Sequence, residues 1–72
     1  MKEFVVCFTL ENDIKREKII KAAYVKKEEV VNEILEKIGH SKYYIAKGEK
    51  GEYRINTSLI RFVSVLHEKE VV

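Results

Sequence analysis

Aromatic and basic residues alternate between residues 42 and 62, and their types suit nucleic-acid binding. Positive side chains neutralise phosphates, and tyrosine rings can stack on the bases of a single strand. The candidate contact residues for nucleic acid or another partner are Lys42, Tyr44, Lys47, Tyr53, Arg54 and Arg61. The alternative is that the tyrosines pack in the core and the cations protect strand edges. A weak nucleic-acid-binding protein with a basic, tyrosine-bearing sheet face is therefore our alternative hypothesis, not the favoured one.

Residues that could serve in nucleophilic catalysis are few and lie far apart in the sequence. The chain has one cysteine, Cys7, and two histidines, His40 and His67. Cys7 lies among apolar residues, which is typical of a packing side chain. Neither histidine has an aspartate near it that could orient the ring as a catalytic base. We therefore expect no catalytic residues and a protein that is not an enzyme.

Patterns that would indicate a metal ion or a bound phosphate are also weak. Glu29, Glu33 and Glu36 share one side of a predicted helix, but charged helix faces are usually only solvated. No pair of cysteines or histidines has the spacing of a metal site. Gly48 and Gly51 belong to a short charged turn that no helix follows, unlike a phosphate-binding loop. We expect neither a metal nor a cofactor.

The length and composition indicate one small globular domain spanning residues 1–72. The 72 residues are 46% hydrophobic and 36% charged, which excludes a disordered tail. No apolar run approaches the roughly 18 residues that a membrane-spanning helix requires. The N-terminus lacks the pattern of a signal peptide, and a single cysteine cannot form an internal disulfide. We expect a cytoplasmic protein without a membrane partner.

The formal net charge of +2 is too small to require a nucleic-acid partner. Its distribution is uneven, because the acidic segment 28–38 lies between the basic segments 1–27 and 39–66. One interpretation is a set of solvated faces on a helix and on strand edges. The other is a dipolar domain with one basic face for a polyanion.

The first two predicted elements are strands. Phe4, Val6 and Phe8 recur with a period of two, which predicts a strand with these side chains in the core. Residues 11–13 form a turn signal. A second strand is predicted over 16–24, although apolar residues on both sides leave its register ambiguous.

A helix is predicted over residues 26–38, where apolar residues form a single stripe. Ile34 and Leu35 lie in the middle of this stripe, so we expect both to be buried. Gly39 fits the left-handed position that ends many helices.

Three further strands are predicted over 42–47, 52–56 and 59–66, with residues 67–72 fraying or adding to an edge. The predicted fold is a single two-layer α+β domain of order β-β-α-β-β-β. In it, a mostly antiparallel sheet of about five strands carries one helix on one face.

One helix covers only one face of a sheet, yet the first strand is apolar on both faces. The second face is predicted to contain Val5 and Cys7, with either Val63 and Val65 or the alternate residues Phe62 and Leu66. We assign the possible dimer face to Val5, Cys7, Val63 and Val65, and we expect a homodimer. Closure of the strands into a small barrel is the alternative.

The favoured function is a non-enzymatic interaction or regulatory module that acts through a protein-partner surface. An origin in a phage, a virus or another mobile element is one interpretation of so small a chain. The sequence does not identify the protein partner.

Overall fold

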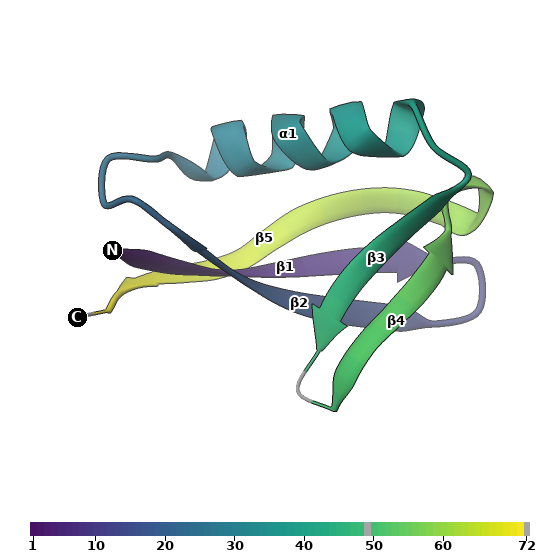
Figure 1. The fold of residues 1–72 in the computed structure, drawn as a ribbon, viewed down its shortest axis with the longest axis horizontal. Coiled ribbons are helices and arrows are strands. Elements are labelled where there is room, and N and C mark those ends of the chain that lie inside the picture. The colour runs from purple at the N-terminus through teal and green to yellow at the C-terminus, as the bar shows by residue number, and fades with distance from the viewer. Residues whose placement is uncertain (49, 72) are drawn as a thin grey trace.

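The computed structural model describes residues 1–48 and 50–71 (Figure 1). In chain order the elements are β1 (Lys2–Leu10), β2 (Ile14–Lys21), α1 (Lys27–Gly39), β3 (Tyr43–Gly48), β4 (Gly51–Asn56), a short 3-10 helix (Thr57–Leu59) and β5 (Ile60–Glu70). The predicted α+β class and the order β-β-α-β-β-β are confirmed. The five strands are antiparallel and form two sheets rather than one: a three-stranded sheet of order β2-β1-β5 and the hairpin β3-β4.

The centre of the three-stranded sheet is β1, the strand that is apolar on both faces. It pairs along its length with β2 on one side and β5 on the other. The predicted turn at residues 11–13 is present. The Leu10 N–H donates to the Asp13 carbonyl oxygen at 2.8 Å, and the Ile14 N–H donates to Asp13 Oδ1 at 2.7 Å. These bonds satisfy backbone donors where the chain reverses.

The core lies between the three-stranded sheet and a second layer, in which α1 and the β3-β4 hairpin lie side by side (Figure 1). The predicted inward set of β1 is confirmed, because Phe4, Val6 and Phe8 are fully buried. The buried core cluster consists of Phe4, Val6, Phe8, Val30, Ile34, Tyr44, Ala46 and Ile55. The Phe8 and Tyr44 rings lie 5.1 Å apart between centroids, so the hairpin contributes an aromatic contact to the sheet.

The helix follows its predicted range closely but differs in two details. Ile34 is buried, whereas Leu35 is 48% exposed, so the expectation that both are buried was wrong for Leu35. The reason is that α1 packs on the core through Val30, Ile34 and Ile38, and Leu35 lies about 100° around the helix from Ile34. Gly39 is the last helical residue, and Gly51 is the one described residue with a positive φ.

Two strand boundaries differ from the prediction. The second strand was expected over 16–24 but spans Ile14–Lys21, so its start follows directly on the turn. The last strand was expected to end at residue 66, with residues 67–72 fraying or adding to an edge. β5 continues to Glu70, which pairs with Lys2, so residues 67–70 add to the sheet. Val72 lies outside the described residues. Pairing with the first residues of β1 orders this end of the chain.

The register of β5 corrects the predicted dimer face. Val63 pairs with Phe8, and Val65 pairs with Val6. Paired residues in neighbouring strands project to the same side of a sheet, so both valines face the helix and pack against the core. The assignment of Val63 and Val65 to one face with Val5 and Cys7 was therefore wrong.

Candidate functional site

The side of the three-stranded sheet that points away from α1 presents both apolar and charged side chains, and we call it the outer face. Its members, by register, are Glu3, Val5, Cys7 and Thr9 of β1, Ile14, Arg16, Lys18 and Ile20 of β2, and Phe62, Ser64, His67 and Lys69 of β5. Side chains of the flanking strands bury Val5 and Cys7, whereas Phe62, Ile14 and Ile20 are 59%, 55% and 48% exposed. Because α1 and the hairpin pack on the opposite side, Val5 and Cys7 lie at the centre of the outer face with Arg16 and Lys18 beside them. The three half-exposed apolar side chains lie towards the ends of the face, Ile14 and Phe62 at one end and Ile20 at the other.

The outer face also contains two of the residues considered for catalysis. Cys7 pairs with Ser64 on β5, and Val5 pairs with His67. Cys7 and His67 are therefore close register neighbours, although within residues 1–48 and 50–71 no hydrogen bond joins them. Cys7 is buried, in agreement with its interpretation as a packing residue. His40 lies elsewhere, as the C-cap of α1, where its N–H donates to the Lys37 carbonyl oxygen.

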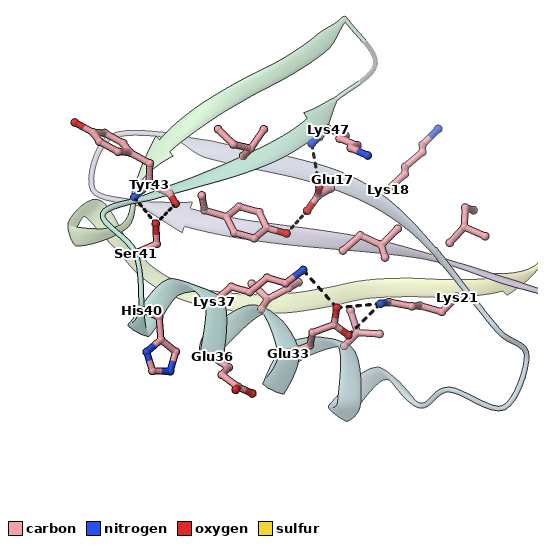
Figure 2. Close-up of a pocket in the computed structure, with 16 residues that line it drawn as sticks. Glu17, Lys18, Lys21, Glu33, Glu36, Lys37, His40, Ser41, Tyr43 and Lys47 are labelled. Carbon is pink, nitrogen blue, oxygen red and sulfur yellow. Dashed lines mark hydrogen bonds and ion pairs between the residues drawn. The ribbon is translucent and has the colours of Figure 1, made fainter.

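A buried carboxylate fixes the hairpin to the edge of the three-stranded sheet. Glu17 of β2 accepts a hydrogen bond from the Tyr44 hydroxyl at 2.7 Å and another from the Lys47 N–H at 2.9 Å (Figure 2). Glu17 points inward between the layers and is 6% exposed. Burial, followed by the hydrogen bond to Glu17, raises the pKa of Tyr44, so this phenol remains protonated. Two donors thus satisfy the carboxylate where β3 crosses β2.

The groove in Figure 2 lies between α1, β2 and β3 and has a volume of about 970 Å³. Its charged side chains mostly pair with one another. Lys21 Nζ lies 3.0 Å from Glu33, and Lys37 Nζ lies 3.5 Å from the same carboxylate. The hydrogen bond from Lys21 is the main reason that the pKa of Glu33 is lowered. This pairing holds α1 to β2 and leaves the groove with little net charge for a ligand.

The predicted contact residues of the alternative hypothesis do not form one surface. Tyr44 is buried in the core, so its assignment as an exposed contact residue was wrong. Tyr53 is half-buried, and its hydroxyl donates to the Arg16 carbonyl oxygen. Neither ring is free to stack on a base. The tyrosine-bearing sheet face that the sequence suggested is therefore an inner surface of the hairpin.

The predicted cations are divided among separate places. Arg54 lies over the Tyr43 ring on the outer side of the hairpin, 4.8 Å from its centroid. Arg61 pairs with Glu11 at 2.8 Å, beside the first turn. Lys42 precedes β3, and its carbonyl oxygen accepts a hydrogen bond from Thr57. Lys47 alone lies at a concave site.

That concave site, which we call the basic groove, lies where the hairpin projects past the edge of β2. It has a volume of about 760 Å³, and its cations are Lys15, Arg16, Lys18, Lys47 and Lys50. Among the described lining residues Glu52 is the one acidic side chain. Sequence reasoning missed the three cations of β2. The available signal was the run Lys15-Arg16-Glu17-Lys18, in which Glu17 turns inward and Arg16 and Lys18 project from the opposite side of β2.

Within the part of the chain that the structure describes, no group of three metal-binding side chains comes together. In the same residues no helix is long and apolar enough to cross a membrane. Comparison with known proteins gives no match to a family model, to a curated protein or to a solved structure.

Proposed function

We propose that the protein is a non-enzymatic interaction module that forms a twofold homodimer through its outer face. The observation that supports this proposal is the exposure of three apolar side chains on this face, Ile14 and Phe62 at one end and Ile20 at the other, with Val5 and Cys7 between them. Contiguous apolar patches of several hundred Å² on a soluble protein usually mark a place where another molecule binds. Packing of this face against a second sheet would complete a second core, as in a β-sandwich.

A second copy of the chain suits the outer face because of how its charge is distributed. Arg16 and Lys18 project from β2 on this side, whereas Ser64 and His67 occupy the corresponding part of β5. A twofold axis parallel to the strands would place β2 of one subunit opposite β5 of the other. This arrangement keeps Arg16 and Lys18 of one subunit away from the same residues of the other and brings Ile14 opposite Phe62.

The size of the outer face sets the expected strength of the dimer. Three strands about 4.8 Å apart, with eight paired positions about 3.4 Å apart, give a flat area of roughly 400 Å². Stable interfaces typically bury about 800 Å² of accessible surface on each partner. The outer face is therefore smaller than a typical stable interface, and we expect a weak, reversible dimer.

Sedimentation equilibrium across micromolar concentrations tests this proposal. The expected result is a reversible shift from the 8.5 kDa chain to twice that mass. Phe62→Glu should abolish the shift, because it places two like charges in an apolar interface. Leu35→Glu is the matched control, since Leu35 is similarly exposed but lies on the helix. A single 8.5 kDa species at all concentrations, or equal effects of the two variants, would overturn the proposal.

A further inference from the structure

Among the described strands β3 pairs only with β4, so its other edge is open towards the groove between α1, β2 and β3, which we call the central groove. The Thr57 N–H donates to the Lys42 carbonyl oxygen, which continues the register of β3 with β4. In an antiparallel pair, every second residue directs its backbone groups to the partner strand. By this alternation the N–H and C=O groups of Tyr43, Ile45 and Lys47 point away from β4, towards the central groove.

Two side-chain contacts confirm the direction of this edge, and one backbone position remains open between them. The Lys47 N–H donates to Glu17 at 2.9 Å, and the Tyr43 N–H donates to Ser41 Oγ at 3.4 Å (Figure 2). Between them, the N–H and C=O of Ile45 have no hydrogen-bond partner within residues 1–48 and 50–71. A strand edge with a free donor and a free acceptor is a template for another extended chain.

The chemistry of the central groove favours an uncharged, apolar chain. Its lining includes Ile19, Ile34 and Tyr44, which are apolar side chains of β2, α1 and β3. The carboxylate of Glu33 on the helix wall already pairs with two lysines. A charged ligand would therefore lose its hydration without gaining an unpaired partner on this wall.

From these features we propose that the central groove binds an extended, uncharged segment of a partner protein, which adds to β3 as an antiparallel strand. One residue of such a strand lies opposite Ile45 and exchanges two backbone hydrogen bonds with it. The side chains of the two flanking residues then point inwards, towards Ile19 and the Tyr44 ring, so both should be apolar. A strand occupies roughly 160 Å³ per residue, from spacings of about 3.4, 4.8 and 10 Å. The groove volume of about 970 Å³ thus admits no more than about six residues.

This inference goes beyond the proposed dimer and does not rest on it. Of the residues that line the central groove, Lys18 and Ile20 belong to the outer face, and the inference uses neither. Sedimentation tests the dimer and peptide binding tests the groove, so either proposal can fail while the other stands.

The test is NMR of the backbone amides of the isotope-labelled protein, titrated with a capped hexapeptide that alternates valine and threonine and has no charge. In the free protein the Ile45 amide should exchange with solvent faster than the Tyr44 amide, which bonds to β4. On addition of the peptide, the Ile45 amide should become protected and should show one of the largest shifts.

Two modified peptides separate strand pairing from apolar contact. N-methylation of the threonine amides removes the donors that face Ile45 and should weaken binding at least about fivefold. N-methylation of the valine amides is the matched control, because these amides point away from β3, and it should leave the affinity within about twofold of the parent peptide. A peptide with glutamate in place of valine should not bind.

Two proline variants test the same bond from the protein side. Ile45→Pro removes the N–H that faces the groove and should weaken binding at least about fivefold. Arg54→Pro is the matched control, because Arg54 lies opposite Ile45 and directs its N–H to the other edge of the hairpin, where proline is tolerated. If Ile45→Pro does not fold, the two N-methylated peptides with the wild-type protein decide the question alone.

Four results would overturn the inference. They are slow exchange of the Ile45 amide in the free protein, equal binding of the two N-methylated peptides, equal binding of the glutamate peptide, and no shift at millimolar concentrations of the parent peptide. Protection of the Ile45 amide that increases with protein concentration alone would assign this edge to a second copy of the chain, and would overturn it too.

Discussion

The Tyr44 hydroxyl donates a hydrogen bond to Glu17 Oε1 over 2.7 Å and thereby joins the two sheets across a buried interface. The same carboxylate accepts the Lys47 N–H, so Glu17 has a donor for each oxygen. A buried carboxylate is stable only when such donors are present. Glu17 is thus the residue through which the sequence of β2 determines where the hairpin lies.

Removal of the Tyr44 hydroxyl should destabilise the protein measurably. Tyr44→Phe leaves one oxygen of a buried carboxylate without its donor, and we expect a loss of about 1.5–3 kcal/mol. Urea unfolding measures this loss. Tyr24→Phe is the matched control, because Tyr24 is 84% exposed, and it should change stability very little. Equal stability of the two variants would contradict the role given to Glu17.

The same tyrosine should make stability depend on alkaline pH. Burial, followed by the bond to Glu17, raises the pKa of Tyr44 above its ordinary value of about 10. As pH rises past this value, the unfolded chain loses the phenol proton while the folded chain keeps it, so the free energy of unfolding decreases. The advantage of wild type over Tyr44→Phe should therefore be smaller near pH 11 than near pH 7. A constant difference in urea unfolding would refute this dependence.

Two neighbouring helix residues should respond very differently to truncation. Ile34 is 2% exposed in the core and Leu35 is 48% exposed. Ile34→Ala should cost about 2–4 kcal/mol through lost burial and a residual cavity. Leu35→Ala should cost less than about 1 kcal/mol. Thermal melts of both variants provide the comparison, and similar melting temperatures would mean that α1 packs through a different face.

Two glycines should have opposite effects when alanine replaces them. A Cβ at Gly48 would lie 2.7 Å from Tyr53 Cε1, and the Tyr53 ring is held by its hydroxyl bond. Gly48→Ala should therefore destabilise by about 1–3 kcal/mol. Gly39 is helical and its Cβ would meet nothing within 4 Å, so Gly39→Ala should stabilise by about 0.5–1 kcal/mol. Chemical denaturation measures both changes in stability. A loss of stability in both variants, or a gain in both, would contradict the structure.

Cys7 should react slowly with a thiol reagent in the native protein and rapidly after unfolding, because it is buried. If the outer face is a dimer interface, Phe62→Glu should also accelerate the native reaction by separating the subunits. Labelling at increasing protein concentration distinguishes burial within one subunit from burial by dimerisation. Only protection by dimerisation should increase with concentration. Rapid labelling of the native wild type would contradict the packing role of Cys7.

The sequence alone predicts the α+β order and the inward set of β1, because only one alternation of large apolar residues is possible there. It does not determine which alternate residues of β5 face the core, because Val63 and Val65 alternate with the equally apolar Phe62 and Leu66. Pairing with β1 settles that choice, and such pairing is a property of the whole fold. For the same reason, adjacent tyrosines at 43 and 44 cannot be assigned to inside and outside from the local pattern.

The candidate contact residues were harder to predict than the strands. Arg16 and Lys18 lie in a strand whose two sides both contain isoleucine, so the local pattern does not show which side faces solvent. The groove also requires the hairpin to cross β2. Glu17, which is distant from the hairpin in the sequence, holds the hairpin there through its bond with the Lys47 N–H. Residue types indicated a basic, aromatic region, but only the register separates the rings inside from the cations outside.

The pairing of β1 with β5 joins the first and last strands of the described chain, with Lys2 opposite Glu70. During folding, β1 can therefore complete its pairing only after β5 is available. On a ribosome, residues 1–59 would emerge with one edge of β1 unpaired and the apolar side chains of that strand exposed. Contacts between such distant residues also slow folding, because a long loop must close before they form. The first hairpin and α1 can form early, but the core closes only when residues 60–70 have left the exit tunnel.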